Sequence, residues 1–558
     1  MVYIYHLCNS ILAFASCALG HHVQAWEQNT PTGSPEPLIN QGISALGGLN
    51  SISAIKNVRY IGNSILRSKG LMLSISVHGL DQATIAAGRQ NVTFSFEQPH
   101  VKQRIDTIAQ LGATWTFSRP TLEPMDFSHL VEGGDDGFAA RLRGSSLVFD
   151  PAQPEGYMDG LLASYLITEA NKWDPLLIRT ILTNKKATYR VGKTEAGIEL
   201  PGVHDESIGL TILFHPDTKL PYIIRSYEDH PFFGPSTHDL LVYNYVEVDG
   251  VEFPRRFKTI YNNKHVIADY AADQVLSNLE LEEGFFSRPG TGTVPEDSIP
   301  TRDPEYGFAE IGETASNFVW SGPYTGTFEA LDASAEQPFQ DVPGLWILNM
   351  VMRQAVVELE DGSVIVLDAP PHQSKLVIDW VQQRLGKNVT HVWPTHHHHD
   401  HSFGVADYAA IGAKIIVPEN GAPYYARLNL TQGQILTYRR GDAMVLKDSK
   451  TQLALVDMQG TIHAEDHGYA FISSARPTTN SSTALFEADH ANLATIDSAD
   501  HGMLQELIDV LVRDRVTLDT YFFPVHGPDG NLADFLIPSG TKYPVYSPLD
   551  YRYNEPSY

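Results

Sequence analysis

Between residues 363 and 418, strand-like and helix-like segments alternate, and this alternation limits the folds open to the chain. Short apolar runs typical of buried strands lie at 363–370, 390–395 and 413–418, and segments with apolar residues at helical spacing lie between them at 374–386 and 403–413. Each helical segment stops at or near a glycine. A strand–helix–strand–helix–strand order predicts an α/β domain in which parallel strand pairs carry helices on their faces.

The histidine-rich stretch PTHHHHDHSFG, residues 394–404, lies where the second of these strands passes into a helix. Ligand sites in α/β sheets favour the carboxyl ends of strands. Taken alone, the stretch also fits a metal-binding tract without catalysis, or a run of solvated histidines. A catalytic metal site needs further ligands from elsewhere in the chain.

The spacing within the stretch separates its side chains into groups. Alternate residues of a turning loop point the same way, so His396 and His398 can share one ion. Asp400 and His401 follow as the helix begins and can face a second ion. The intervening histidines at 397 and 399 would point away.

Three further candidate ligands follow in order, where later β-like segments end: His463 in GTIHAED, Asp489 in ALFEADH and His526 in FFPVHG. We expect these segments to build one sheet edge, which would bring the three side chains together. His467 is an alternative to His463. We favour His463 because it is expected directly after its strand.

Two nearby residues have open roles. Asp368 ends the strand VIVLD, and it can either orient a ligand histidine through a carboxylate–imidazole hydrogen bond or serve as a turn residue. His490, beside Asp489, is expected to support a ligand or to lie at the surface.

The first half of the chain has a mainly strand-like pattern. Runs rich in β-branched and aromatic residues, such as NVRYIG, TFSFEQ, TWTFSR and DLLVYNYVEV, alternate with turn signals, and Asp249-Gly250 predicts a hairpin. Only 157–182 reads as helical. A Gly-, Pro-, Ser- and Thr-rich stretch follows and reads as a linker. The predicted organisation is a signal peptide at 1–25, a β-rich α+β domain at 36–285, a linker at 286–316, an α/β domain at 317–540 and a tail at 541–558.

The N-terminus indicates secretion. An apolar stretch of about a dozen residues precedes Val23-Gln24-Ala25, a small-x-small cleavage site, and it is too short to span a bilayer. We therefore expect a secreted or secretory-pathway protein without an integral membrane segment in the mature chain. Both cysteines, Cys8 and Cys17, lie in this stretch, so no metal ligand of the mature chain would be a cysteine. Four sequons for N-glycosylation fit this route: Asn91, Asn388, Asn429 and Asn480.

The charge balance argues against a nucleic-acid partner. The chain carries 39 Lys and Arg against 66 Asp and Glu, a formal charge of −27. Nucleic-acid binding depends on basic groups that displace counterions. The expected partner is a small-molecule substrate, with a homodimer possible.

The order HxHxDH, then a single histidine, an aspartate after an apolar strand and a histidine before glycine resembles the metallo-β-lactamase superfamily over about residues 317–540. The spacings are 67 residues from His396 to His463, 26 to Asp489 and 37 to His526. LFEADHAN is similar to a branch of bacterial and fungal members of undefined substrate, and such proteins often carry a β-rich N-terminal region that resembles lipoprotein-carrier half-barrels. The implied fold is the αββα sandwich of this superfamily.

The resemblance implies two divalent metal ions, most often zinc, with iron and manganese also compatible with His and Asp ligands. The first ion would be held by His396, His398 and His463, and the second by Asp400, His401 and His526, with Asp489 bridging. A bridging aspartate and the absence of a cysteine ligand resemble the thioesterase, lactonase and phosphodiesterase branches more than true antibiotic-hydrolysing enzymes.

The expected activity is hydrolysis by a hydroxide held between the two ions, with Asp400 as the catalytic residue that orients the nucleophile and handles its proton. Secretion disfavours a cytosolic glutathione thioester, so a small ester, lactone or related carbonyl compound is the expected substrate, in natural-product tailoring or detoxification. Two alternatives stay open. One is a non-catalytic protein that binds metal and an apolar ligand, and the other is an iron or manganese redox member of the same fold.

Overall fold

The computed structural model describes residues 33–68, 86–111, 124–144, 156–194, 196–230, 232–262, 265–290, 311, 324–461, 463–491, 501–536 and 540–554. The expected signal peptide, the run TWTFSR and most of the expected linker lie outside these ranges. The chain forms two compact units. Unit 1 holds the described residues up to 311, apart from 110 and 111, and unit 2 holds those from 324 onward.

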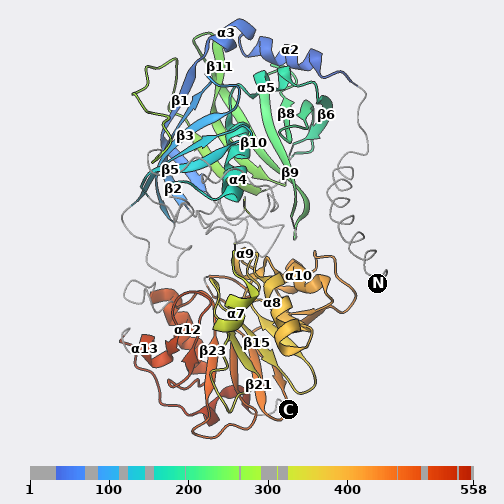
Figure 1. The fold of residues 1–558 in the computed structure, drawn as a ribbon, viewed down its shortest axis with the longest axis vertical. Coiled ribbons are helices and arrows are strands. Elements are labelled where there is room, and N and C mark those ends of the chain that lie inside the picture. Colours follow the sequence, from blue (N-terminus) through green and yellow to red (C-terminus); the bar gives the residue numbers. More distant parts are fainter. Residues whose placement is uncertain are drawn as a thin grey trace, which may run out of the picture. The chain divides into compact units, whose positions relative to one another are not determined.

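Unit 1 is built on one antiparallel sheet (Figure 1). Its strands are β1 (Asn57–Ser68), β2 (Ala86–Ser95), β3 (Lys102–Leu111), β4 (Met125–Glu132), β5 (Phe138–Gly144), β6 (Ala187–Lys193), β7 (Glu199–Asp205), β8 (Leu210–Phe214), β9 (Pro221–His230), β10 (Gly234–Val248), β11 (Val251–Tyr261), β12 (His265–Ala271) and β13 (Gln274–Ser277). Strands β1 to β5 lie in sequence order across the sheet, and so do β6 to β12. The two series join where β1 pairs with β12, and β13 pairs with another part of β1.

The hairpin between β10 and β11 confirms the Asp249-Gly250 prediction. Val248 pairs with Val251, and the two turn residues have φ of 52° and 75°. Positive φ at both central positions is the type I′ geometry that matches the twist of paired strands.

Four helices belong to unit 1: α2 (Glu36–Ala45), α3 (Leu49–Ala54), α4 (Gly160–Trp173) and α5 (Leu177–Thr183). The last two confirm the helical prediction for 157–182, with an interruption at Pro175, which cannot donate a backbone hydrogen bond. The side chain of Asp159 caps α4 by accepting the N–H groups of Leu161 and Leu162. Apolar residues of these helices share one core with residues of the sheet, and the ring of Trp173 stacks on that of Phe257.

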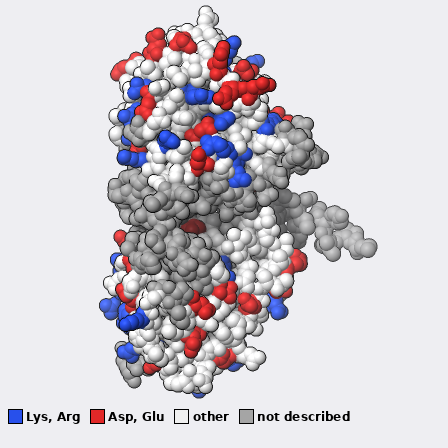
Figure 2. All heavy atoms as spheres, turned by 90° about the vertical axis from the view of Figure 1, so that its left-hand side faces the viewer, with Lys and Arg blue, Asp and Glu red and all other residues white. Residues whose placement is uncertain are grey.

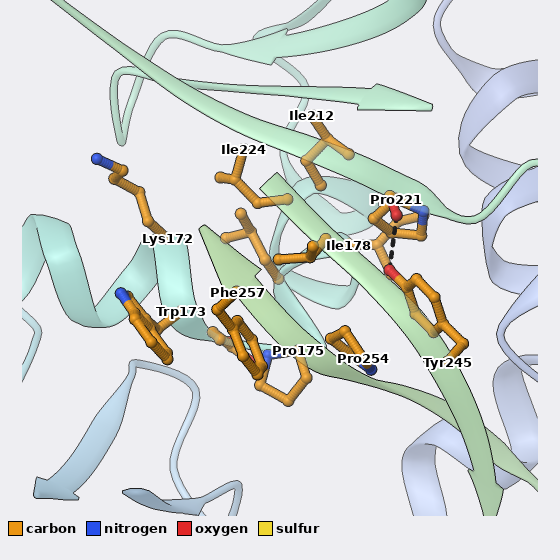
Figure 3. Close-up of a pocket in the computed structure, with 13 residues that line it drawn as sticks. Lys172, Trp173, Pro175, Ile178, Ile212, Pro221, Ile224, Tyr245, Pro254 and Phe257 are labelled. Carbon is orange, nitrogen blue, oxygen red and sulfur yellow. Dashed lines mark hydrogen bonds between the residues drawn. The ribbon is translucent and has the colours of Figure 1, made fainter. Parts of the chain in front are cut away.

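An apolar pocket lies between α4, α5 and strands β8 to β11 of unit 1 (Figure 3). Its walls include Trp173, Ile224 and Phe257, and the hydroxyl of Tyr245 donates to the carbonyl of Pro221 at 2.6 Å. Most of its lining side chains are apolar, so this pocket suits an apolar rather than a charged occupant.

Unit 2 contains two six-stranded sheets that face each other. The first holds β14 (Leu345–Leu348), β15 (Gln354–Glu358), β16 (Val364–Leu367), β17 (His391–Trp393), β18 (Lys414–Pro418) and β19 (Ile435–Tyr438). The second holds β20 (Ala443–Lys447), β21 (Thr451–Asp457), β22 (Gly468–Ser474), β23 (Thr483–Phe486), β24 (Tyr521–Phe522) and β25 (Gly530–Asn531). Strands β16 to β19 are parallel, as are β23 and β24. Residues of both sheets, such as Trp393 and Leu455, form the core between them.

Helices cover the outer faces of the two sheets. They are α7 (Phe328–Ser334), α8 (Ser374–Trp380), its π-helical continuation at Val381–Leu385, α9 (His399–Ser402), α10 (Val405–Ala410), α11 (Ala422–Tyr425), α12 (His501–Arg513) and α13 (Leu532–Leu536). In Figure 1, α8 and α10 lie on one side of the strands, and α12 and α13 lie on the other. This αββα order confirms the predicted fold of the second half, and the antiparallel sheet of unit 1 confirms the β-rich first half.

The strand–helix alternation predicted for 363–418 is present as β16, α8, β17, α10 and β18. Strands β16 and β18 are apolar along almost their whole length because sheets with helices on one face and a second sheet on the other bury both faces. Tyr551, in the expected tail, is buried and stacks on Phe471 at 3.8 Å between ring centroids.

None of the described helices is long and apolar enough to cross a membrane. On the face drawn in Figure 2, the described Lys and Arg side chains lie among Asp and Glu side chains rather than in one continuous basic patch.

Candidate metal centre

All the predicted ligands except His463 lie just beyond the ends of three strands. Strand β17 ends three residues before His396, β23 ends three residues before Asp489, and β24 ends four residues before His526. His463 differs from the expectation. It lies in the loop between β21 and β22, six residues after β21 ends, so the prediction that it directly follows a strand is wrong.

Four of the predicted ligands form a first group: His396, His398, His463 and Asp489, whose ligand atoms lie within 4.8 Å of one another. The Nε2 atoms of His396 and His463 are 3.2 Å apart. Oδ2 of Asp489 lies 2.9 Å from Nε2 of His463 and 3.3 Å from Nε2 of His396. The group is almost wholly buried, so its members face each other rather than water.

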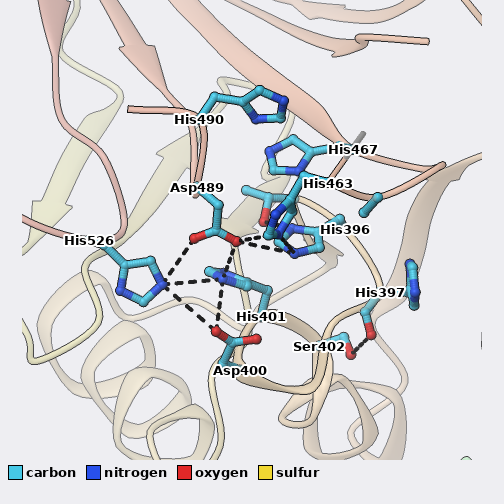
Figure 4. A network of polar contacts seen from close by, with 12 residues as sticks. His396, His397, Asp400, His401, Ser402, His463, His467, Asp489, His490 and His526 are labelled. Carbon is cyan, nitrogen blue, oxygen red and sulfur yellow. Dashed lines mark hydrogen bonds and ion pairs between the residues drawn. The ribbon is translucent and has the colours of Figure 1, made fainter. Parts of the chain in front are cut away.

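The other three predicted ligands, Asp400, His401 and His526, form a second group (Figure 4). Nε2 of His401 lies 3.3 Å from Oδ2 of Asp400 and 3.4 Å from Nε2 of His526. Side-chain exposure is 30% for Asp400 and 25% for His526, whereas His401 is fully buried. Solvent therefore reaches the centre from the side of Asp400 and His526.

Asp489 links the two groups. Its Oδ2 also lies 3.1 Å from Nε2 of His401, and its Oδ1 lies 3.2 Å from Nε2 of His526. Figure 4 shows this carboxylate between the histidines of the first group and the pair formed by His401 and His526. A carboxylate in this place can contact two ions at once.

The spacing fits metal coordination. Two ligand atoms at about 2 Å from one ion in a tetrahedral set are roughly 3.3 Å apart. The distances between neighbouring ligand atoms around Asp489 run from 2.9 to 3.3 Å. Nε2 of His398 is buried and has no hydrogen-bond partner among the described residues. A buried polar atom without a partner is costly, and an ion coordinated there would remove that cost.

Electrostatics also favour a cation. Burial lowers the pKa of His396 and of His398 well below the ordinary value, which keeps both imidazoles in the neutral form that coordinates metals. Burial alone would lower the pKa of His401 too, but three carboxylates raise it well above its ordinary value: those of Asp400, Asp489 and Asp368. This site therefore attracts positive charge, and a cation would displace the proton from His401.

Residues around the two groups hold the ligand-bearing loop. Nδ1 of His401 lies 2.7 Å from Oδ2 of Asp368, the orienting role that the sequence left open for this aspartate. As expected, His397 and His399 point away from the two groups. Each is buried against its own partner, Asp466 at 2.6 Å and the Tyr424 hydroxyl at 2.7 Å respectively.

The alternative ligand His467 belongs to a third group with Glu487 and His490. Its Nε2 lies 2.7 Å from Oε1 of Glu487. His490 is fully buried, so the expectation that it might lie at the surface is wrong, and the supporting role remains. Sequence reasoning missed Glu487 and also Asp466. The only signal for Glu487 was its place between an apolar strand and Asp489 in LFEADH.

The four sequons fall in different surroundings. Asn388, Asn429 and Asn480 are exposed and lie outside strands. Asn91 is half-buried in β2, where it pairs with Ile61 of β1. Only the first three therefore offer open room for a glycan.

Residues 354–467 match the family model described as the metallo-beta-lactamase superfamily. The matched segment contains the HxHxDH stretch and His463. A search of curated proteins found no match.

Solved structures similar to part of this chain include three metallo-β-lactamases. One is a B3 enzyme with an active-site glutamic acid, at 14% identity, covering 37% of this chain and 92% of that chain with a TM-score of 0.26. Another is the enzyme from Pontibacter korlensis, at 18% identity, 36% and 94% coverage and a TM-score of 0.28. FIM-1 from Pseudomonas aeruginosa, in its mono-zinc form, matches at 17% identity, 37% and 93% coverage and a TM-score of 0.27.

The family model matches the strands and the loop that carry the first ligands, and unit 2 has the αββα order predicted from the sequence. Residues 354–467 are therefore similar to the metallo-β-lactamase superfamily, and the αββα order of unit 2 agrees with that match.

Proposed function

We propose that the protein is a secreted hydrolase that uses two divalent metal ions to cleave a small ester, lactone or related carbonyl compound. We expect both ions to be zinc. The observation that carries this proposal is the position of Asp489, whose two oxygens contact both ligand groups. A carboxylate shared in this way supports two adjacent ions rather than one.

Two ions at such a centre lower the pKa of a water toward neutrality and polarise the oxygen of a carbonyl group. The chain's own residues supply the rest. An imidazole that coordinates a metal carries no charge, so His396, His398 and His463 as ligands would leave the positive charge of the ions uncompensated. The carboxylates of Asp400 and Asp489 would offset only part of this positive charge, so the centre would still attract the carbonyl oxygen of a substrate.

Asp400 is the proposed catalytic residue. It is the most exposed member of the two groups, at 30%, and its Oδ2 lies 3.9 Å from Nε2 of His526. A carboxylate at the open side of the centre can orient a water by accepting its hydrogen and can take up its proton. Substrate would arrive on the side of Asp400 and His526, because the other ligands are almost wholly buried.

The test is the metal content of the purified protein, measured by elemental analysis on wild type, His398→Ala and a matched His391→Ala control. His391 lies in β17 of the same unit and contacts Thr390 rather than either ligand group. We expect about two zinc equivalents in wild type and in the control, and about one or fewer in His398→Ala, with wild type and the control hydrolysing members of an ester, lactone and thioester panel.

Other outcomes contradict the proposal in distinct ways. Stoichiometric iron or manganese without hydrolysis would favour the redox alternative. A folded wild-type protein without stoichiometric metal would favour a non-catalytic protein, whose apolar ligand would occupy the pocket of unit 1.

A further inference from the structure

Glu487 lies two residues before Asp489 in the chain, and its carboxylate is fully buried. Its Oε1 accepts the backbone N–H groups of Asp489 and of His490, each at 3.1 Å. The two N–H groups belong to the turn that follows β23. Glu487 therefore fixes the backbone from which the side chain of Asp489 projects.

The same carboxylate also receives two imidazoles. Nε2 of His467 lies 2.7 Å and Nδ1 of His490 lies 3.0 Å from Oε1 of Glu487. On its other side, Nε2 of His490 lies 3.4 Å from Oε2 of Glu506 in α12. Glu487 thus ties the turn after β23 to the start of β22 and, through His490, to α12.

Through His467, Glu487 is also linked to the first ligand group. The ring of His467 stacks on the ring of His396, with centroids 4.4 Å apart and planes at 17°. Glu487 supports a ligand on each side in this way, His396 through His467 and Asp489 through the backbone.

His467, Glu487 and His490 could also be taken for a third metal site, since their ligand atoms cluster. The contacts argue against it. The spacings of 2.7 and 3.0 Å at Oε1 of Glu487 are hydrogen-bond lengths. Two backbone N–H groups also point at Oε1, and their positive ends would repel a cation there.

We propose that Glu487 is a positioning residue that holds Asp489 between the two ligand groups, and that without it the protein binds one ion well but not two. This inference rests on the proposed two-ion function. Asp489 contacts both ligand groups. If the turn that carries it became mobile, the affinity for the second ion would fall before the affinity for the first. The first ion keeps three histidines of its own.

The test compares Glu487→Ala, Glu487→Gln and an Asp514→Asn control. Asp514 is likewise a fully buried carboxylate of unit 2, but its partners are Tyr469, Arg513 and Arg552, away from the ligands. Zinc binding is measured by chelator competition, and the visible spectrum of the cobalt-loaded protein reports the coordination of each equivalent.

We expect Glu487→Ala to keep its first equivalent and to bind the second at least about tenfold more weakly, since removal of such outer partners commonly costs 10- to 100-fold in metal affinity. Glu487→Gln retains an acceptor oxygen for the two backbone N–H groups and should recover most of the loss. Asp514→Asn should lower stability and leave both affinities unchanged.

Two equivalents bound with wild-type affinity by folded Glu487→Ala would overturn the proposal. If that variant fails to fold, His490→Gln carries the test, and wild-type affinity for the second equivalent in that variant would overturn the proposal equally. A third equivalent in wild type that disappears in His490→Gln would make the cluster an ion site instead. Absence of any metal from wild type would contradict the proposed function itself, a result distinct from all of these.

Discussion

Nδ1 of His401 lies 2.7 Å from Oδ2 of Asp368, and the other oxygen of this carboxylate, Oδ1, accepts the backbone N–H of Thr395 at 3.0 Å. Asp368 directly follows β16 and has a φ of 72°, an uncommon backbone conformation for a residue other than glycine. One aspartate thus joins the end of β16 to the loop after β17, and it fixes the His401 ring so that Nε2 faces the second ligand group.

From this contact we predict that Asp368→Asn weakens binding of the second metal ion by about 10- to 100-fold. The amide cannot hold the Nδ1–H of His401 as strongly as a carboxylate, so the ring is less well oriented and less basic. Zinc affinity measured by chelator competition checks this, with Asp514→Asn again as the control for a lost buried carboxylate. Unchanged affinity in folded Asp368→Asn would mean that the aspartate serves only the turn.

The parts of the centre that could be predicted from the sequence are those with a local signal. The strands and helices around 363–418 follow from periodicity, and the first four ligands follow from their spacing in one loop. Asp489 and His526 were found because each follows an apolar strand.

The remainder depends on contacts between distant segments. His463 lies in a loop, and sequence periodicity does not predict the path of a loop. Glu487 matters because it contacts His467 and is linked to α12, and these segments come together only in the folded chain. In unit 1, β1 pairs with β12, about two hundred positions away, so the strand order of the sheet could not be read from local patterns.

We predict that Gly47→Ala destabilises unit 1 strongly, whereas Gly209→Ala does so mildly. Both glycines have positive φ, 115° and 66°, which costs other residues about 1–2 kcal/mol. A Cβ on Gly47 would lie 2.0 Å from the carbonyl oxygen of Gly250, while nothing lies within 4 Å of one on Gly209. The backbone must move in the first case only, so we expect a loss of about 3 kcal/mol or more there.

Chemical unfolding of the two glycine variants checks this difference. Equal shifts of the unit 1 transition would show that the contact between Gly47 and the hairpin of β10 and β11 relaxes without cost.

If the protein is secreted as proposed, glycans should be found on Asn388, Asn429 and Asn480 and not on Asn91. The first three are exposed, whereas Asn91 is half-buried in β2, which lies between β1 and β3. Peptide mass mapping before and after enzymatic glycan removal identifies the modified positions. A fully occupied Asn91 would contradict the paired position of β2, and four unmodified asparagines on secreted protein would make all the sequons chance matches.

A final prediction concerns the pH dependence of unit 1. Burial raises the pKa of the Asp174 carboxyl from 3.8 to about 6, although the N–H of Leu176 and the charge of Arg179 act in the opposite direction. The folded state therefore holds this proton more tightly than the unfolded chain. Its contribution to stability is complete below pH 3.8 and is lost as the pH rises through about 6.

Asp174→Asn removes this dependence and keeps an oxygen that can accept the N–H of Leu176. Relative to wild type, the variant should gain stability between pH 4 and pH 7, by at most about 3 kcal/mol and by less where water reaches the partly exposed carboxylate. The measurement is the free energy of unfolding of both proteins at the two pH values. A difference between variant and wild type that is the same at both would show that the carboxyl titrates alike in the folded and unfolded chains.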